Sequence, residues 1–250
     1  MANICSFVAL LFGYLCFTTN AISHCNGESN VGCIQSERLA LLRFKAGLKD
    51  PHQLLSSWMG ANCCAWTGVS CDNETGHVIA IDLRYHHLSN DHSTDWRLGG
   101  EIGSSLLDLK DLKHLDLSSN NFGGRTIPHY IGSMAELRYV NLSNAGFSGR
   151  IPHQLGNLSN LEYLDLNSFH SLYNLNADSI RWLSNLASLR YLDMTRVTLA
   201  KASDWFHAVN ALPSLSVLHL PFCRLSNIPA AISHSSRTQS SIQSFPWFNT

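Results

Sequence analysis

The chain has 250 residues, of which 45% are hydrophobic and 14% are charged, and its formal net charge is −1. This length and apolar content are enough for a buried core, while the near-neutral charge argues against a nucleic-acid or anionic-membrane partner. Eight cysteines are present, at positions 5, 16, 25, 33, 63, 64, 71 and 223. Five of the last six lie between residues 25 and 71, which favours a disulfide-stapled segment over scattered buried thiols.

The N-terminal region contains an apolar run of 14 residues from Ile4 to Phe17. It is too short to span a bilayer but suits the core of a signal peptide, with cleavage after Ala21 or Ser23. A short buried helix is the competing interpretation, and the lack of Lys or Arg before the run departs from the usual signal pattern. We expect residues 1–23 to be a signal peptide and the protein to be secreted or displayed at the cell surface. No second run of about 20 apolar residues occurs, so no transmembrane segment is expected in this chain.

Residues 24–76 are predicted to form a helical cap. Ser36 is a candidate N-cap for a helix from Glu37 to about Leu48, which Asp50-Pro51 would end. The helix is expected to place three residues on one face: Leu39, Leu42 and Ala46. A second short helix is expected over residues 53–59.

The cap also holds a cysteine cluster, Cys63-Cys64 followed by Cys71. Adjacent cysteines rarely bond to each other, so each is expected to pair with a cysteine elsewhere. A zinc site is the competing interpretation, but the C-x-x-C spacing typical of such sites is missing.

The middle of the chain repeats one motif at a spacing of 25 and 24 residues, starting at Leu112, Leu137 and Leu161. The pattern L-x-x-L-x-L-x-x-N at this spacing is the strand-and-turn signature of a leucine-rich repeat. One such repeat cannot bury a core alone, so the repeats must stack. We therefore predict an α/β solenoid, a horseshoe arc of about five to six repeats over residues 77–226. The irregular tail, residues 227–250, is interpreted as a truncated repeat.

The repeats lose their turn asparagine after the first copy. Asn120 is present, but the equivalent positions hold Ala145, Phe169, Val197 and Cys223. Because a cysteine tolerates the same buried position, Cys223 is interpreted as a structural substitute. An insertion from Tyr85 to Arg97 contains several histidines, but nothing in its spacing would preorganise metal ligands.

Alternation along each strand predicts which side chains leave the core on the concave face. One column is aromatic in its centre: Ala80, His114, Tyr139, Tyr163, Tyr191 and Val217. The next column is largely acidic: Asp82, Asp116, Asn141, Asp165, Asp193 and His219. We take the candidate binding face to be His114, Asp116, Tyr139, Tyr163, Asp165, Tyr191 and Asp193, and we expect these charged residues to be exposed. Lateral packing of the tyrosines as a structural stripe is the alternative, and the sequence leaves both open.

Three N-x-S/T sequons mark candidate glycosylation sites in a secreted chain, at Asn73, Asn141 and Asn157. A glycan on Asn141 would stand on the concave sheet, whereas Asn157 is expected on the opposite, helical side. Motifs for a nucleophile elbow, a zinc protease or a phosphate loop are absent, so we predict a protein that is not an enzyme and that needs no cofactor or metal.

Several strings resemble one family closely. The cap elements Glu37-Arg38 to Lys45, Leu55 to Trp58 and Cys63 to Cys71 look like the N-terminal cap of plant extracellular leucine-rich-repeat proteins. Residues 99–109 and 137–147, with the string from Lys201 to Leu215, resemble plant receptor-like proteins of the disease-resistance group, close to the xylanase-elicitor and leaf-mould-resistance types.

That resemblance implies disulfides Cys33–Cys63 and Cys64–Cys71. It also implies cell-surface perception of a protein, peptide or glycan ligand, with signalling through a receptor-kinase coreceptor. Full family members carry more repeats, a C-terminal cap and a transmembrane helix, so we expect a truncated or fragmentary receptor. A secreted inhibitor of microbial cell-wall hydrolases, or a non-functional remnant, are the alternatives.

Overall fold

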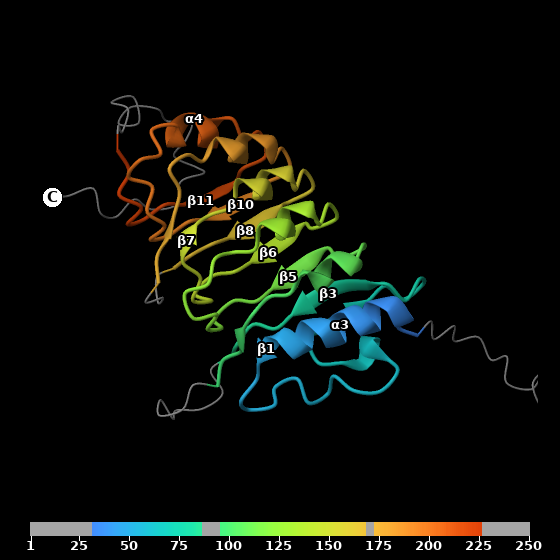
Figure 1. The fold of residues 1–250 in the computed structure, drawn as a ribbon. Coiled ribbons are helices and arrows are strands. Elements are labelled where there is room, and N and C mark those ends of the chain that lie inside the picture. The colour runs from blue at the N-terminus through green and yellow to red at the C-terminus, as the bar shows by residue number, and fades with distance from the viewer. Residues whose placement is uncertain (1–31, 87–95, 169–172, 227–250) are drawn as a thin grey trace, which may run out of the picture. The chain divides into compact units, whose positions relative to one another are not determined.

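A computed structural model describes residues 32–86, 96–168 and 173–226 (Figure 1). The expected signal peptide, most of the histidine-containing insertion, Phe169 and the tail from Asn227 lie outside these residues. Within the part of the chain that is described, no helix is both long and apolar enough to cross a bilayer.

The cap begins with helix α3, Gln35–Gly47, so Ser36 lies inside the first turn and Ile34 takes the N-cap position. The buried face of α3 is also one residue away from the expected one, since its buried residues are Glu37, Ala40, Leu41 and Phe44. Leu39 is 41% exposed. The buried face of α3 includes Glu37 because its carboxylate accepts a hydrogen bond from the Val78 amide at 2.7 Å. The same carboxylate contacts the His77 ring at 2.8 Å.

The prediction of a second helix over residues 53–59 is wrong, because this segment forms turns. Asp50 explains the difference: its two carboxylate oxygens accept the amides of Leu54 and Leu55, both at 2.8 Å. Gln53 has a φ of 56°, which is incompatible with a right-handed helix. The side chain of Lys45 in α3 donates to the carbonyl of Leu55 at 2.7 Å and ties the turn to the helix.

Each repeat contributes one strand to a seven-stranded sheet, and the cap contributes the edge strand β2. Its strands are β2 Val69–Cys71, β3 Val78–Asp82, β5 His114–Asp116, β6 Tyr139–Asn141, β8 Tyr163–Asp165, β10 Tyr191–Asp193 and β11 Val217–His219. The order in the sheet is β11-β10-β8-β6-β5-β3-β2, which follows the chain from one repeat to the next. All pairs are parallel except β2 with β3, through which the cap joins the sheet.

The opposite layer consists of short 3-10 helices, one after each strand turn: η2 Ser104–Asp108, η3 His129–Ser133, η4 His153–Asn157 and η5 Arg181–Asn185. They lie side by side along one side of the sheet, followed by α4, Trp205–Asn210 (Figure 1). The helical insert expected over residues 178–186 is thus a five-residue 3-10 turn. Between the layers lie fully buried strand residues such as Leu115, Val140, Leu164 and Leu192.

Close packing of these helices depends on two glycines. A Cβ on Gly156 would lie 2.7 Å from the carbonyl oxygen of Trp182 in η5. A Cβ on Gly132 would clash with the backbone carbonyl of Gln154 in η4. Both glycines therefore allow neighbouring repeats to approach at backbone distance.

A second, narrower strip of pairing runs along the turns after the strands. β7, Gly149–Arg150, pairs in parallel with β9, Leu175–Asn176, and Asn176 forms a further parallel bridge to Thr198. In the cap, β1, Leu48–Lys49, pairs antiparallel with β4, Gly99–Gly100. The predicted leucine-rich-repeat solenoid with its disulfide-stapled helical cap is confirmed.

Candidate functional site

The open face of the sheet, which is the face turned away from the buried leucines, presents a stack of aromatic rings. The predicted register is observed, with His114 paired to Tyr139, Tyr139 to Tyr163 and Tyr163 to Tyr191. Ring centroids of these successive pairs are 4.1, 4.2 and 4.2 Å apart, with interplanar angles of 8–11°. We call these four residues the aromatic column.

Stacking at this distance covers both faces of the inner rings. Tyr139 and Tyr163 each have a ring on either side, and all four residues of the column are nevertheless half-buried rather than buried. The part that remains accessible must therefore be the ring edges and hydroxyl groups. Lateral packing of the tyrosines, one of our two interpretations, is present, and it leaves a continuous row of edges as a surface that a ligand can touch.

The aromatic column is electrically neutral at physiological pH. Burial raises the pKa of the Tyr163 hydroxyl far above its usual value, and burial likewise raises the pKa of Tyr139 and Tyr191. At the end of the column, burial lowers the pKa of the His114 imidazole. The rings thus offer hydrogen-bonding edges without a formal charge.

The neighbouring polar column departs from our expectation of exposed charges. Asp116 is fully buried, and Asp165 and Asp193 are 8% and 4% exposed. Each carboxylate accepts the backbone amide two residues further along its own turn, at 2.9 Å for Asp116 and Asp165 and 2.8 Å for Asp193. These acids are covered because the turn after each strand folds back over them, so they hold the turns rather than project into solvent.

A buried acid of the polar column also forms a hydrogen bond with the aromatic column. The hydroxyl of Tyr139 donates to the second carboxylate oxygen of Asp116 at 3.2 Å, and Arg84 lies 3.7 Å from the same oxygen. On the far strands, Asp193 lies 3.3 Å from the ring nitrogen Nδ1 of His219. Burial raises the pKa of Asp165 to about 6, helped by the nearby charge of Asp193.

The three sequons differ in accessibility. Asn73 and Asn157 are exposed, and Asn157 ends η4 on the helical side as expected. Asn141 is 9% exposed; its Oδ1 accepts the amide and hydroxyl of Ser143 at 3.0 and 2.7 Å. The amide nitrogen that would carry the sugar donates to Asp116 at 3.3 Å. Use of all three sequons stays a prediction, and the burial and hydrogen bonds of Asn141 lead us to expect no glycan there.

The cysteines pair as the resemblance implied. Disulfides join Cys33 to Cys63 and Cys64 to Cys71. Three of these sulfurs lie close enough together to resemble a metal cluster, but all three are oxidised, which removes the thiolates that zinc would need.

Cys223 is a free buried thiol in the turn-asparagine position. Its Sγ donates to the carbonyl of Met194 in the preceding repeat at 3.0 Å, just as the side-chain amide of Asn120 donates to the carbonyl of Leu83 at 2.7 Å. The thiol therefore replaces one of the asparagine's hydrogen bonds, in agreement with the structural interpretation.

Two groups were missed from the sequence. Glu37, His77 and Asp111 converge between the cap and the first repeats, where the hydrogen bond to Glu37 raises the pKa of His77. No short-range motif marks this cluster, because the three residues come from separate elements. A recess lined by Arg196, Phe222 and their neighbours lies at the turns after β10 and β11.

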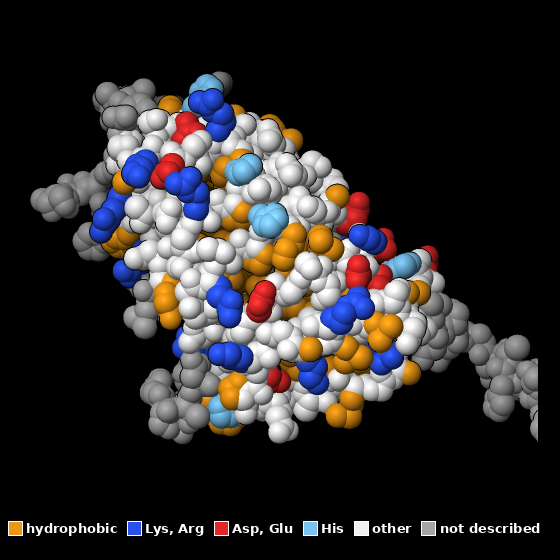
Figure 2. Space-filling model, in the orientation of Figure 1, with side chains coloured by type: hydrophobic (Ala, Val, Ile, Leu, Met, Phe, Trp, Pro, Cys, Tyr) orange, Lys and Arg blue, Asp and Glu red, His pale blue; other side chains and the backbone are white. Residues whose placement is uncertain are grey.

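Charge on the surface is mixed. On the face drawn in Figure 2, positive and negative side chains are interspersed, and no large area carries a single sign. Surface ion pairs include Arg138 with Glu162 at 3.6 Å and Arg150 with Asp178 at 2.6 Å. Such a surface is unlike the continuous basic face that binds a phosphate backbone.

Comparison with known families gives two matches. Residues 34–72 match the leucine rich repeat N-terminal domain, and residues 111–134 and 136–158 match the leucine rich repeat. The first match covers the cap with its disulfides, and the second covers the two best-formed repeats.

Similar proteins come from plants. The receptor-like protein EIX1 of Solanum lycopersicum is 39% identical over 209 residues, which is 81% of this chain and 20% of that protein. The receptor-like protein EIX2 of the same species is 46% identical over 121 residues, 48% of this chain and 12% of that protein. The chain thus spans about a fifth or less of these relatives.

Solved structures agree with the sequence comparison. A chain from the BIR3–SERK2 complex of Arabidopsis thaliana is 32% identical with a TM-score of 0.54, covering 64% of this chain and 81% of that one. The ectodomain of the Arabidopsis receptor kinase HAESA, in complex with an IDA peptide hormone, is 27% identical with a TM-score of 0.65, covering 83% of this chain and 32% of that one. By its cap, its repeats and these relatives, the chain belongs to the leucine-rich-repeat receptor-like proteins of plants.

Proposed function

We propose that this chain forms part of an extracellular, non-catalytic surface that recognises a peptide, protein or glycan ligand in plant defence. The observation that carries the proposal is the aromatic column, a half-exposed row of four stacked rings on the open face of a parallel sheet. Because the rings stack on one another, and the hydroxyls of Tyr139 and Tyr163 also contact the buried carboxylates of Asp116 and Asp165, little side-chain entropy is lost when a ligand binds. Preorganised aromatic residues of this kind are enriched where proteins recognise partners.

The relatives support this assignment. The HAESA ectodomain of similar fold was crystallised with a peptide hormone, and the BIR3 chain was crystallised with SERK2. We infer by analogy that the present chain presents its ligand to a receptor kinase, which would supply the signalling activity that a repeat solenoid lacks. The buried acids of the polar column fit a non-catalytic role, because Asp116 and Asp193 are engaged with their own turns and sealed from substrate.

Binding by the full chain to defined probes tests the proposal. Suitable probes are a fungal xylanase, the ligand type that the family resemblance implies, and a panel of neutral cell-wall oligosaccharides. We expect the double substitution Tyr163→Ala and Tyr191→Ala to weaken binding at least tenfold, because it removes two ring edges from the surface. Tyr163→Phe keeps the stack and isolates the hydroxyl. The control is His153→Ala, which removes an exposed imidazole ring from η4 on the helical side of the solenoid. This variant should leave binding unchanged.

A second arm tests the receptor-kinase partner. Size-exclusion chromatography of the chain with a SERK-type ectodomain, with and without the bound probe, should show a larger complex only when the probe is present. If a folded double-tyrosine variant binds the probes as tightly as the unmodified chain, the aromatic column is a structural stripe and the proposal fails.

A further inference from the structure

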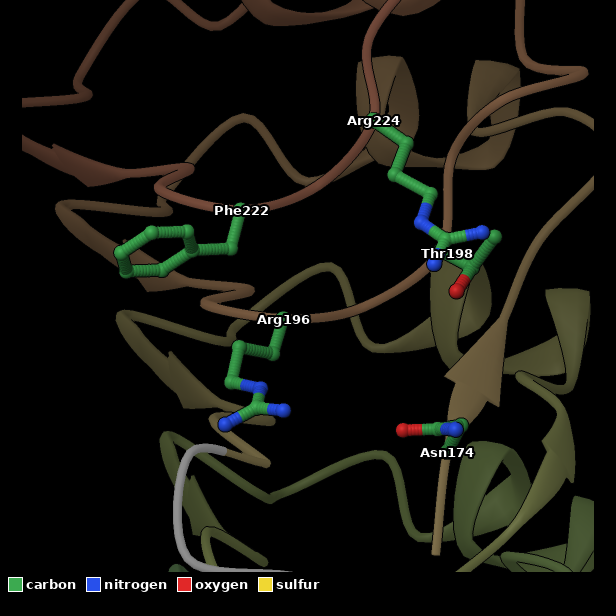
Figure 3. A pocket seen from close by; sticks show the side chains of 5 residues that line it. All are labelled: Asn174, Arg196, Thr198, Phe222 and Arg224. Atoms are coloured by element: carbon green, nitrogen blue, oxygen red, sulfur yellow. The ribbon is translucent and has the colours of Figure 1, made fainter. Parts of the chain in front are cut away.

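A recess of about 610 Å³ opens beside the sheet, on the turns that follow β10 and β11. It is lined by five residues: Asn174, Arg196, Thr198, Phe222 and Arg224. In Figure 3 Arg224, Thr198 and Asn174 lie on one side of the recess and Arg196 lies on the other, while the Phe222 ring stands at the rim and points away from the other four side chains. None of these five residues belongs to the aromatic column or to a strand of the main sheet.

The repeat itself does not require these large side chains. Arg196 and Phe222 occupy the turn position that holds Ser119 and Asn144 in the two best-formed repeats, and all four have a φ between 52° and 63°. Asn adopts this left-handed region readily, whereas bulky residues adopt it rarely and at a cost. Large residues therefore occupy a strained turn position in the two repeats that border the recess.

Among the residues that the structure describes, the lining carries two positive charges and no acidic residue. Arg196 and Arg224 come from consecutive repeats and are both exposed. The chain as a whole has a net charge of −1, so the positive charge is a local property of this recess. Guanidinium groups bind carboxylates through paired, charge-assisted hydrogen bonds, which makes a carboxylate the matching ligand group.

The remaining lining residues match a hydroxyl-rich ring. Phe222 is 59% exposed and offers an apolar surface on which the C–H face of a sugar can pack. The amide of Asn174 and the hydroxyl of Thr198 can each donate to and accept from sugar hydroxyls. The volume of the recess falls within the range of small-ligand sites, which suits one or two sugar rings.

An extended acidic peptide fits less well. A peptide that adds to a sheet needs unpaired backbone groups at an edge. Here the Thr198 amide already donates to the carbonyl of Leu175 at 2.8 Å, and the Thr198 carbonyl accepts from Ala177 at 3.1 Å. Recognition must therefore rely on side chains. We propose that this recess binds an acidic saccharide, whose uronate carboxylate pairs with Arg196 and Arg224 while its ring packs on Phe222.

Calorimetric titration of the full chain tests this assignment. Tetragalacturonate is the probe, and a neutral tetrasaccharide and tetraglutamate are the comparisons. We expect tetragalacturonate to bind, with an affinity that falls as salt is added, and the neutral sugar to bind at least tenfold more weakly. Arg224→Gln and Arg196→Asn should each reduce the affinity at least tenfold. Arg196→Asn restores the residue type of Asn144 at a turn of similar φ, so this variant keeps the fold.

Two control variants test whether binding takes place in this recess. Arg181→Gln changes an exposed arginine of η5 that does not line the recess, and should leave the affinity unchanged. Tyr163→Ala should also leave it unchanged, which distinguishes this proposal from that of the aromatic column. Failure of tetragalacturonate to bind, equal binding of the neutral sugar, or an equal loss in Arg181→Gln would overturn the assignment. Tetraglutamate binding that depends on the same arginines, without binding of the sugar, would overturn it in favour of an acidic-peptide site.

Discussion

Replacement of Asp165 by asparagine should stabilise the protein at neutral pH and remove part of its pH dependence. Burial raises the pKa of this carboxyl from 3.8 to about 6. The folded protein therefore favours the protonated carboxyl, and stability is lost as the pH rises from the unfolded pKa through the folded one. From these two pKa values the effect amounts to about 2–3 kcal/mol between pH 4 and pH 7.

Asparagine is compatible with this position because the neighbouring strand already has one. Asn141 lies beside Asp165 in the register of β6 and β8 and accepts the Ser143 amide at 3.0 Å, as Asp165 accepts the Asn167 amide at 2.9 Å. The substitution therefore keeps the turn hydrogen bond and removes only the buried charge.

Urea unfolding followed by tryptophan fluorescence at pH 4, 5.5 and 7 measures the effect. The free energy of unfolding of Asp165→Asn should exceed that of the unmodified chain by up to about 3 kcal/mol at pH 7, and most of this difference should vanish at pH 4. Glu74→Gln, at an exposed position, should show no such pH-dependent difference. A difference that is constant with pH, or that grows as the pH falls, would refute the reasoning.

Three further outcomes are expected. Gly132→Ala should lower the free energy of unfolding by about 1–3 kcal/mol in urea titrations, because the added methyl meets a backbone carbonyl. Gly103→Ala should change little, because its Cβ would meet only the Ser105 hydroxyl, at 4.0 Å. Asn157→Gln should remove one glycan from the secreted chain in intact-mass spectra, and Asn141→Gln should leave the mass of the attached glycans unchanged. Burial raises the pKa of the Cys223 thiol to about 12, so iodoacetamide at pH 8 should label it only after unfolding.

The aromatic column was predictable because two periodicities determine it together. Alternation along each strand places Tyr139 and Asn141 on the same face, and the constant repeat length brings Tyr163 into register with Tyr139. Neither step needs knowledge of distant contacts. The disulfide pairing was different, since spacing alone left the partners of Cys63 and Cys64 open and only the family resemblance selected them.

Burial of the acids could not be predicted in the same way. Alternation correctly sends Asp116 and Asp165 out of the leucine core, but it contains no information on the turn that then covers them. The prediction for the buried face of α3 failed for a related reason. Glu37 turns inwards because its partner is the Val78 amide, 41 residues away, and no helical periodicity reveals such a partner. The recess at Arg196 depends likewise on turn dihedrals that leucine spacing does not encode.

The two candidate surfaces differ in charge, and this difference separates their ligands in solution. The aromatic column is neutral, because burial raises the pKa of the Tyr163 hydroxyl and the acids beneath it are sealed under their turns. A ligand there is recognised by ring edges and should bind with little dependence on salt. The recess at Arg196 and Arg224 presents two exposed cations, so its ligand should dissociate as salt screens them. A single ligand that needs both surfaces would have to carry an anionic group at one end and a neutral, hydrogen-bonding face at the other. The salt dependence of its affinity would be intermediate. Arg224→Gln should make that affinity nearly independent of salt, and Tyr163→Ala should make it more dependent on salt.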